Sequence, residues 1–262
     1  MSKYLAFQAQ LLFGMVRREI LGRYRGSFLG GVWPLLAPIL LLSVYTVAFH
    51  DLLGARWPGI EGRAGFASMV FAGMLLHGAL AEVLSRAPQT IVGQPNFVKK
   101  VVFPLAVLPV VPVGVAAFHA LLGFFVLAVA AWFVPGEGVR LTALLLPVFL
   151  LPYLVMLAGV SWGLAALGVY VRDVSQVVGI SSTMLLFLSP IFFPLSALPV
   201  EFQPIVALNP LTWVVEGARG LLFDGVLPGL SIMVPYVSVS LSIGVLGAVL
   251  FGRLKPGFGD VL

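Results

Sequence analysis

The amino-acid sequence predicts an all-α integral membrane protein, built as one transmembrane domain with six membrane-spanning helices. Hydrophobic residues make up 60% of the 262 positions and charged residues only 10%, against roughly 25% charged in an average soluble domain. The charged residues are also clustered, so that six long stretches contain none. A water-soluble chain could not bury this much apolar surface. The composition therefore excludes a soluble enzyme, a nucleic-acid-binding domain and a disordered chain.

The stretches without Asp, Glu, Lys or Arg predict the spans. They are residues 26–50, 64–81, 101–136, 141–171, 174–200 and 225–252. A helix needs about 20 apolar residues to cross roughly 30 Å of hydrocarbon, so each stretch can cross once and none can cross twice. We expect spans at about 30–50, 65–82, 113–134, 142–168, 176–195 and 231–252.

Prolines set the expected limits of two spans. Pro104, Pro109 and Pro112 lie in the first third of the longest stretch. Because proline breaks or kinks a helix, residues 101–112 are expected to form a segment near the interface, ahead of the third span. Pro190 and Pro194 are expected to close the fifth span near its far end.

Two further apolar segments are not expected to span. In residues 4–25, apolar side chains recur about every four positions and four arginines fall largely between them, which predicts an amphipathic helix in the membrane interface. Residues 199–224 contain prolines and carry Glu216 and Arg219, which are three positions apart and able to pair. They predict one or two short interfacial or re-entrant helices between the fifth and sixth spans.

The positions of the basic residues predict the orientation. With the N-terminus in the cytoplasm, 11 of the 15 lysines and arginines fall on cytoplasmic segments and 4 on the opposite side. Cytoplasmic loops of membrane proteins carry such an excess of lysine and arginine. We therefore expect both termini in the cytoplasm.

One pattern suggests catalysis. Residues 159–163, GVSWG, match the G-x-S-x-G nucleophile motif around Ser161. That motif needs a strand-to-helix turn, whereas this one lies inside an expected span, where small residues such as Gly159 and Gly163 let helices pack closely. His119 is the only histidine placed deep enough to serve Ser161. Packing through hydrogen bonds is the simpler role for His77 and His119, which leaves an intramembrane serine hydrolase as a weak alternative.

The sequence gives no sign of a nucleotide or metal site. None of the four lysines follows a glycine, so the phosphate-binding Walker A loop is missing. The chain has no cysteine, and its three histidines are scattered. We expect no catalytic residue, cofactor or metal in this chain, and any ATP that drives it must be bound by another protein.

Five segments carry a family resemblance. They are REILGRYRGSFLGGVWPLLAP (18–38), QPNFVKKVVFPL (94–105), VYVRDV (169–174), LSPIFFPLSALP (188–199) and LNPLTWVVEGARGLLFDG (208–225). In this order and spacing they resemble ABC transporter permeases of the polysaccharide-export type, which include O-antigen, capsule and teichoic-acid exporters. The resemblance covers nearly the whole chain. Gln94, Phe97 and Ala106 depart from the family pattern and put only details of one cytoplasmic loop in doubt.

The resemblance implies the membrane subunit of an ATP-driven exporter in a bacterial inner membrane. Two copies would form a homodimer and dock on two separate ATPase subunits, which would bind ATP and Mg. The cytoplasmic loop after the second span would couple to the ATPase, through Arg86, Pro88, Pro95, Asn96, Lys99 and Lys100. Basic side chains can pair with acidic groups on a partner. They also anchor a loop in the cytoplasm, and both roles can hold together.

The implied substrate is a lipid-linked polysaccharide, most like an O-antigen, on a lipid diphosphate. Arginine pairs well with phosphate oxygens, and anionic headgroups of membrane lipids are the alternative partner. The interfacial candidates are Arg17, Arg18, Arg23 and Arg25. Sugars stack on aromatic faces, although aromatic side chains also face lipid or the core. The channel-lining candidates are Trp33, Tyr45, Phe49, Phe187, Phe192 and Phe193.

The re-entrant segment completes the set of candidate residues, with Asn209, Pro210, Trp213, Glu216 and Arg219. The main rival within the same class is a permease for teichoic acid, capsule, lipid or drug. A scaffold with no transport role is a weaker alternative.

Overall fold

The structure is a computed structural model that describes residues 2–26, 28–48, 57, 63–99, 103–133 and 138–262. The helices of ten or more residues are α1 (Ser2–Tyr24), α2 (Trp33–Tyr45), α3 (Arg63–Arg86), α6 (Val110–Trp132), α8 (Leu151–Tyr170), α9 (Val174–Phe187), α11 (Pro210–Arg219) and α12 (Leu230–Leu254). The shorter α-helices are α4 (Gln89–Val92), α5 (Pro95–Lys99), α7 (Leu146–Phe149), α10 (Gln203–Ala207) and α13 (Phe258–Val261). Single turns of tighter or wider helix join them: η1 (Gly30–Val32), η3 (Leu105–Val107), η4 (Leu141–Leu145), η5 (Leu195–Ala197), η6 (Gly220–Asp224) and η7 (Lys255–Gly257).

Five helical stretches within the described ranges are long and apolar enough to cross a membrane. They are Gly30–Ala48, Gly65–Arg86, Leu105–Trp132, Leu141–Tyr170 and Leu230–Val261. Each overlaps one of the expected spans. The chain is therefore an all-helical, multi-pass membrane protein, as predicted.

The expected fifth span is the exception. The prediction placed it at 176–195, whereas α9 ends at Phe187 and has 14 residues, about 21 Å of helix and short of the hydrocarbon thickness. The helix ends because Pro190 has no N–H to continue it. The Ser189 hydroxyl instead donates to the Leu185 carbonyl (2.5 Å) and accepts from the Asn209 amide (2.8 Å). The six-span topology is thus not confirmed by helix length.

The third span begins earlier than expected. Helix α6 starts at Val110, preceded only by the turn Leu105–Val107, so the tail of the expected interfacial segment 101–112 is already helical. Pro109 is the residue before the helix, and Pro112 lies in its first turn. Proline costs no hydrogen bond there, because the first N–H groups of a helix have no partner within it.

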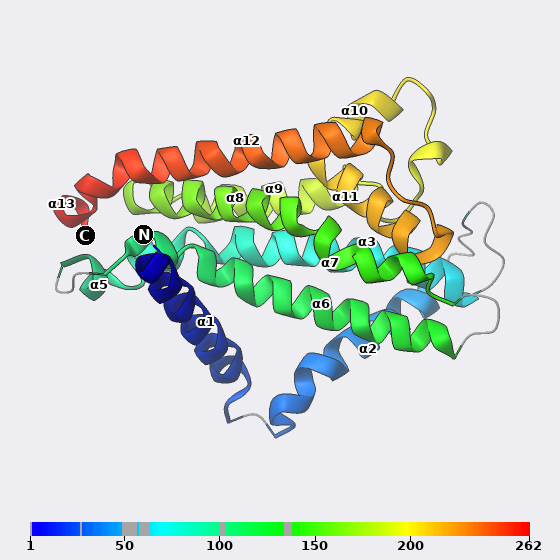
Figure 1. The fold of residues 1–262 in the computed structure, drawn as a ribbon, viewed down its shortest axis with the longest axis horizontal. Helices are drawn as coiled ribbons and strands as arrows, with labels where there is room; N and C mark the ends of the chain where they lie inside the picture. The colour runs from blue at the N-terminus through cyan, green and yellow to red at the C-terminus, as the bar shows by residue number, and fades with distance from the viewer. Residues whose placement is uncertain (1, 27, 49–56, 58–62, 100–102, 134–137) are drawn as a thin grey trace.

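Helices α3, α6, α8 and α12 form the bundle (Figure 1), and the closest pairs are α8 with α12 and α3 with α6. Glycines bring α8 and α12 together. A Cβ at Gly159 would collide with the backbone of Ile243 and Gly244, and one at Gly247 with the backbone of Gly159. Gly163, by contrast, has only the tip of Leu250 nearby, at 3.9 Å. The predicted small-residue packing is therefore confirmed for Gly159 and wrong for Gly163.

Two tyrosines add a polar link inside the core. Tyr153 and Tyr236 are 2% and 0% exposed. The Tyr236 hydroxyl donates to the Phe149 carbonyl and accepts from the Tyr153 N–H, both at 2.9 Å. The Tyr153 hydroxyl donates to the Leu76 carbonyl at 2.7 Å. Helix α3 is thereby connected to α8 and α12.

Helix α1 leans against the bundle along one face and diverges from it towards α2, so that α1 and α2 form a V (Figure 1). Its half-buried residues recur at helical spacing: Gln8, Leu11, Leu12, Met15, Val16, Glu19, Ile20 and Tyr24. Most of the apolar stripe predicted to face lipid therefore faces protein. The turn between the helices uses Gly26 and Gly30, whose φ angles of +84° and +46° disfavour any L side chain.

The expected re-entrant segment contains α10, α11 and η6, which agrees with one or two short helices. Helix α11 is mostly buried and packs on α3 and α12. Asn209 caps it, because its side-chain oxygen accepts from the Leu211 N–H at 3.0 Å, and Pro210 occupies the first helical position. Trp213 packs against the main core. That the segment enters the membrane stays a prediction.

Candidate functional site

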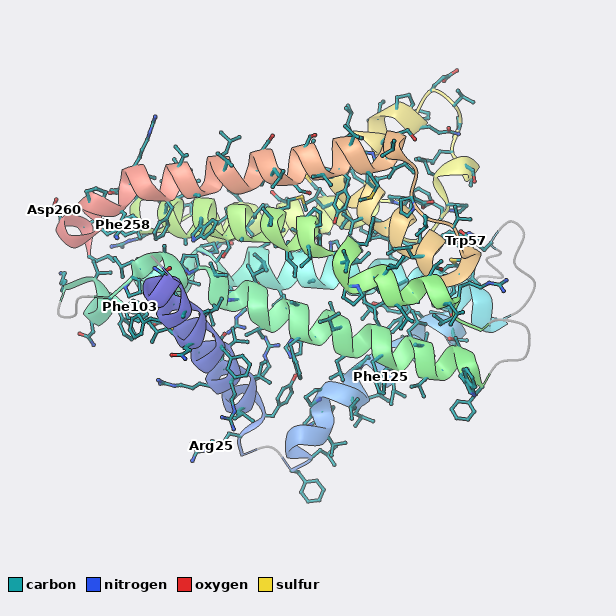
Figure 2. All side chains as sticks on the ribbon, in the orientation of Figure 1. Arg25, Trp57, Phe103, Phe125, Phe258 and Asp260 are labelled. Atoms are coloured by element: carbon teal, nitrogen blue, oxygen red, sulfur yellow. The ribbon has the colours of Figure 1, made fainter. Side chains whose placement is uncertain are left out.

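The four arginines of α1 form two groups in the structure. Arg23 pairs with Glu82 of α3, with 2.8 Å between Nη2 and Oε1. Arg17, Arg18 and Arg25 are exposed, and no hydrogen bond or ion pair joins their guanidinium groups to another residue that the structure describes. Figure 2 shows Arg25 at the end of α1 that lies away from the bundle. Only three of the four predicted arginines are therefore free to meet a ligand.

The Arg23–Glu82 pair belongs to a network between α1, α3 and α6. His119 Nδ1 lies 2.9 Å from Glu82 Oε2, and the Tyr24 hydroxyl lies 3.1 Å from His119 Nε2. A histidine that carries its proton on Nδ1 donates to Glu82 and accepts from Tyr24, which satisfies both contacts. We call the set Glu19, Arg23, Tyr24, Glu82, Arg86 and His119 the Glu82 network.

Arg86 closes the Glu82 network at the end of α3. Its guanidinium pairs with Glu19 of α1 and lies 3.4 Å from Glu82 Oε1, one helical turn earlier. Arg86 was predicted as an ATPase-coupling residue, and the structure places its charge towards α1. From the sequence, Glu19 and Glu82 had no predicted role, and His119 was expected to pack or, as a weak alternative, to serve Ser161. One signal was available, since Glu82 directly follows a charge-free stretch and precedes Arg86 by four positions.

Two grooves flank α1. The polar groove, about 710 Å³, lies between α1 and the elements from the end of α3 to the start of α6, and is lined by Arg18, Ser85, Gln89, Thr90 and Gln94 among others. The apolar groove, about 890 Å³, lies between α1, the start of α2 and α6, and its walls include Ile20, Leu21, Pro34 and Phe118. Arg17, Arg18 and Arg25 line the apolar groove, and Arg18 lines both.

The predicted coupling loop folds as α4 and α5. Pro88 is buried at the start of α4, and its carbonyl lies against Gly168 of α8 so closely that a Cβ there would collide with it. The Gln89 side chain donates to the Ser175 hydroxyl of α9 at 3.2 Å. In α5, Pro95, Asn96 and Lys99 are exposed. Lys100 lies outside the described residues.

The coupling loop rests on its own small core, in which Ile91 of α4 clusters with buried residues of α8, α12 and α13. Figure 1 shows α5 at the same end of the molecule as both chain termini, and the labelled Phe103 and Phe258 mark this end in Figure 2. The side of the membrane on which this end lies stays a prediction.

The aromatic candidates lie in two places. Trp33 and Tyr45 are the first and last residues of α2, both half-buried. Phe187 ends α9 and is 66% exposed, with its ring centroid 6.2 Å from that of Phe192, while Phe193 is half-buried. Phe49 lies outside the described residues.

Arg219 holds the segment after α9 in place. It is 2% exposed and donates to the carbonyls of Met69 (3.0 Å), Pro190 (2.5 Å) and Ile191 (2.7 Å). Its predicted pairing with Glu216 is present at 3.2 Å, and its guanidinium carbon lies 4.5 Å from the centre of the Trp57 ring. Burial lowers the pKa of Arg219 to about 10, opposed by Glu216, so the group stays charged at neutral pH.

Arg219 has a structural role, because its side chain fills the space between α11 and α3. It reaches α3 where Gly73 leaves space, since a Cβ there would lie 2.9 Å from the guanidinium. A charge so fully enclosed by hydrogen-bond acceptors cannot also bind a ligand. The geometry gives Arg219 a structural task, which the sequence pattern could not distinguish from a functional one.

The serine motif has no catalytic geometry. Ser161 is fully buried in the middle of α8, and its hydroxyl donates to the Pro109 carbonyl at 2.5 Å. His119 is engaged with Glu82 and Tyr24 instead. His77 is buried and bonds the Ser182 carbonyl at 3.0 Å, as expected of a packing residue. In the part of the chain that the structure describes, no cluster of three His, Cys, Asp or Glu side chains is suited to a metal.

Comparison with known proteins identifies the family. The ABC-2 type transporter family matches residues 10–223. An O-antigen export system permease protein RfbA of Klebsiella pneumoniae is 23% identical over 263 residues, which cover 100% of this chain and 98% of that protein. The RfbA of Myxococcus xanthus is 28% identical over 234 residues, or 88% and 86% of the two chains.

A third relative has a less specific name. The inner membrane transport permease YadH of Escherichia coli K12 is 26% identical over 196 residues, which cover 72% of this chain and 75% of that protein. The matched region includes most of the spans, the coupling loop and α11. The chain belongs to the ABC-2 type transporter family, as a membrane permease subunit and not as the ATPase.

Proposed function

We propose that this protein is the transmembrane subunit of an ATP-driven exporter that moves a lipid-linked polysaccharide of the O-antigen type out of the cytoplasm. Two copies form a homodimer in the inner membrane, and two ATPase subunits dock on α4 and α5. Each copy crosses the membrane six times, with α9 and the turn after it forming the fifth crossing and both termini in the cytoplasm. The ATPase subunits hold ATP and Mg, and this chain needs no cofactor.

The observation that carries the proposal is the apolar groove with its three unpaired arginines. Arg17, Arg18 and Arg25 line a groove whose other walls are largely apolar. A lipid diphosphate has both parts of this chemistry, because its phosphates pair with guanidinium groups and its chain needs apolar contact. The full-length similarity to permeases named for O-antigen export supports the same substrate class.

The polar groove suits the part of the substrate that follows the diphosphate. Arg18 lines both grooves, and the neutral polar side chains beyond it include Gln89, Thr90 and Gln94. Amide and hydroxyl groups offer sugars both hydrogen-bond donors and acceptors. Phe187 at the end of α9 and Phe192 shortly after it provide apolar faces on which sugar rings stack.

The test depletes the protein and measures lipid-linked polysaccharide in cytoplasmic and surface fractions. We expect the polymer to accumulate inside and its surface form to disappear. An unchanged distribution would sink the polysaccharide proposal. It would favour a permease with a different cargo, for which the similarity to YadH is the present support.

The arginine assignment has a control on another helix, α12. The double change Arg18→Gln and Arg25→Gln removes two unpaired charges, and we expect export to fall about ten-fold or more with normal membrane insertion, because charge-assisted bonds to phosphate are lost. Arg253→Gln, which removes an exposed arginine at the end of α12, leaves export unchanged. If the double variant exports normally, these arginines serve only as anchors to anionic headgroups.

A further inference from the structure

The Glu82 network brings three cationic or proton-donating groups onto one carboxylate. Arg23 and His119 lie 2.8 and 2.9 Å from its two oxygens, and Arg86 lies 3.4 Å from one of them. The Glu82 side chain is 15% exposed, less than the 21–42% of these three partners. Glu82 is therefore the centre of the network, and the three partners come from α1, α3 and α6.

Helix α1 has little else to hold it near this point. The polar groove and the apolar groove open on its two sides. Its apolar contacts include Val16 against Gly114 of α6, where no Cβ would fit, and Met15 against the small core around Ile91. The position of α1 thus depends on the apolar contacts along its half-buried stripe and on the charges of the Glu82 network.

The same network is joined to the coupling loop. Arg86 is the last residue of α3, and α4 starts three positions later. Helix α4 is fixed to α8 through Pro88 and Gly168 and to α9 through Gln89 and Ser175. An unbroken series of contacts therefore leads from the loop through Arg86 and Glu82 to Arg23 and Glu19 of α1.

We propose that Glu82 is a positioning residue that transmits displacement of the coupling loop to α1. The inference rests on the proposed function, because it requires an ATPase that moves the loop. A carboxylate held by several charged donors resists separation of the elements that supply them. When the ATPase shifts α4 and α5, the end of α3 and helix α1 move as one unit, and the two grooves beside α1 change shape with each ATP cycle.

The experiment compares Glu82→Gln with Glu201→Gln, which changes an exposed glutamate in the segment before α10. Both are made in the full permease–ATPase complex, reconstituted in lipid vesicles. In Glu82→Gln we expect export to fall about ten-fold, which is the size of effect typical of coupling between two sites. ATP hydrolysis is expected to be retained. Glu201→Gln is expected to keep both activities. Arg23→Gln added to Glu82→Gln is expected to cause no further loss, because both changes remove the same contact.

A second readout separates transmission from simple loss of structure. The chain contains no cysteine, so spin labels can be placed specifically at Phe13→Cys on the exposed face of α1 and Arg172→Cys in the turn between α8 and α9. We expect the label distances to change between the nucleotide-free and vanadate-trapped complexes, and Glu82→Gln to abolish this change while nucleotide is still trapped. If Glu82→Gln fails to assemble, His119→Gln, which removes a single donor, is measured in its place.

The outcomes are distinct. Normal export by Glu82→Gln, or an unchanged nucleotide-dependent distance change, overturns the inference. A wild-type complex in which α1 does not move with nucleotide overturns it as well, even when polysaccharide is exported. A wild-type complex in which α1 moves, and Glu82→Gln abolishes the movement, but no polysaccharide is exported supports the role of Glu82 and overturns the proposed substrate.

Discussion

Helices α12 and α1 both lie against the bundle along one face, yet different forces hold them there. Helix α12 meets α8 backbone to backbone at Gly159, Gly244 and Gly247, with Tyr236 hydrogen-bonded beneath. Helix α1 is held by ion pairs and by a half-buried apolar stripe, and it has a groove on each side. Close backbone packing permits no sliding, whereas ion pairs between long side chains re-form after a small shift. We therefore propose α8 and α12 as the fixed frame and α1 as the element able to move.

The largest loss of folded protein is expected from Gly159→Leu, which disrupts the contact between α8 and α12. The new side chain has no room against Ile243 and Gly244, and such overpacking costs about 3 kcal/mol or more. We expect little folded protein after detergent extraction, measured as the yield of monodisperse permease. Gly163→Ala, on the same helix with only Leu250 nearby, is the control and is expected to keep the wild-type yield.

The next prediction compares the loss of stability on replacing a buried arginine with the loss on replacing an exposed one. Arg219→Gln leaves three backbone carbonyls without their donor and should lower the free energy of unfolding by about 3–5 kcal/mol. Arg23→Gln breaks a pair whose arginine is 42% exposed, and should cost about 1 kcal/mol or less. Thermal unfolding in detergent measures both. Equal losses would mean that α1 belongs to the fixed frame after all.

A smaller loss of stability is expected from removing one buried hydroxyl group. Tyr236→Phe loses two hydrogen bonds inside the core and should destabilise the protein by about 1–3 kcal/mol. Tyr170→Phe loses one bond, to the Leu254 carbonyl at the exposed end of α8, and should cost about 1 kcal/mol or less. Chemical denaturation of the two variants tests the order, and a larger loss for Tyr170→Phe would contradict it.

The smallest effect is on solvent access at raised ionic strength. Salt at 1 M screens charges beyond about 3 Å and weakens half-exposed ion pairs. A thiol at Leu12→Cys, on the bundle-facing side of α1, should then react with maleimide a few times faster, while one at Ser240→Cys, fully buried in α12, stays unreactive. Labelling of both thiols without any dependence on salt would show that charge does not hold α1.

Much of the fold could be predicted because a long stretch without charged residues is what a membrane-spanning helix requires. Five of the six stretches hold a helix long enough to span. The stretch 174–200 contains 16 apolar residues, as many as 26–50 and more than 64–81. Its helix length is instead set by Pro190 and by the hydrogen bond that Asn209, twenty residues later, makes to Ser189. Counting charges cannot detect that interaction.

The sequence could predict which residue types form the candidate site, but it could not predict which residues they contact. Arg17, Arg18, Arg23 and Arg25 are equivalent in sequence, and only the position of Glu82 on another helix separates Arg23 from the rest. For the same reason Gly159 and Gly163, one turn apart on α8, looked alike until α12 was placed. Periodicity within a helix predicts which residues share a face, and the neighbouring helix decides which of them matter.

The Glu82 network also sets an order of events during synthesis. Arg23 precedes Glu82 by 59 positions, so at about 5–20 residues per second its partner on α3 is made roughly 3–12 seconds later. Until then α1 has no ion pairs with the bundle, and its arginines can rest only on the headgroups of the membrane surface. Docking of α1 therefore waits until α3 and α6 have been made, and the helix made first cannot take its final place at once.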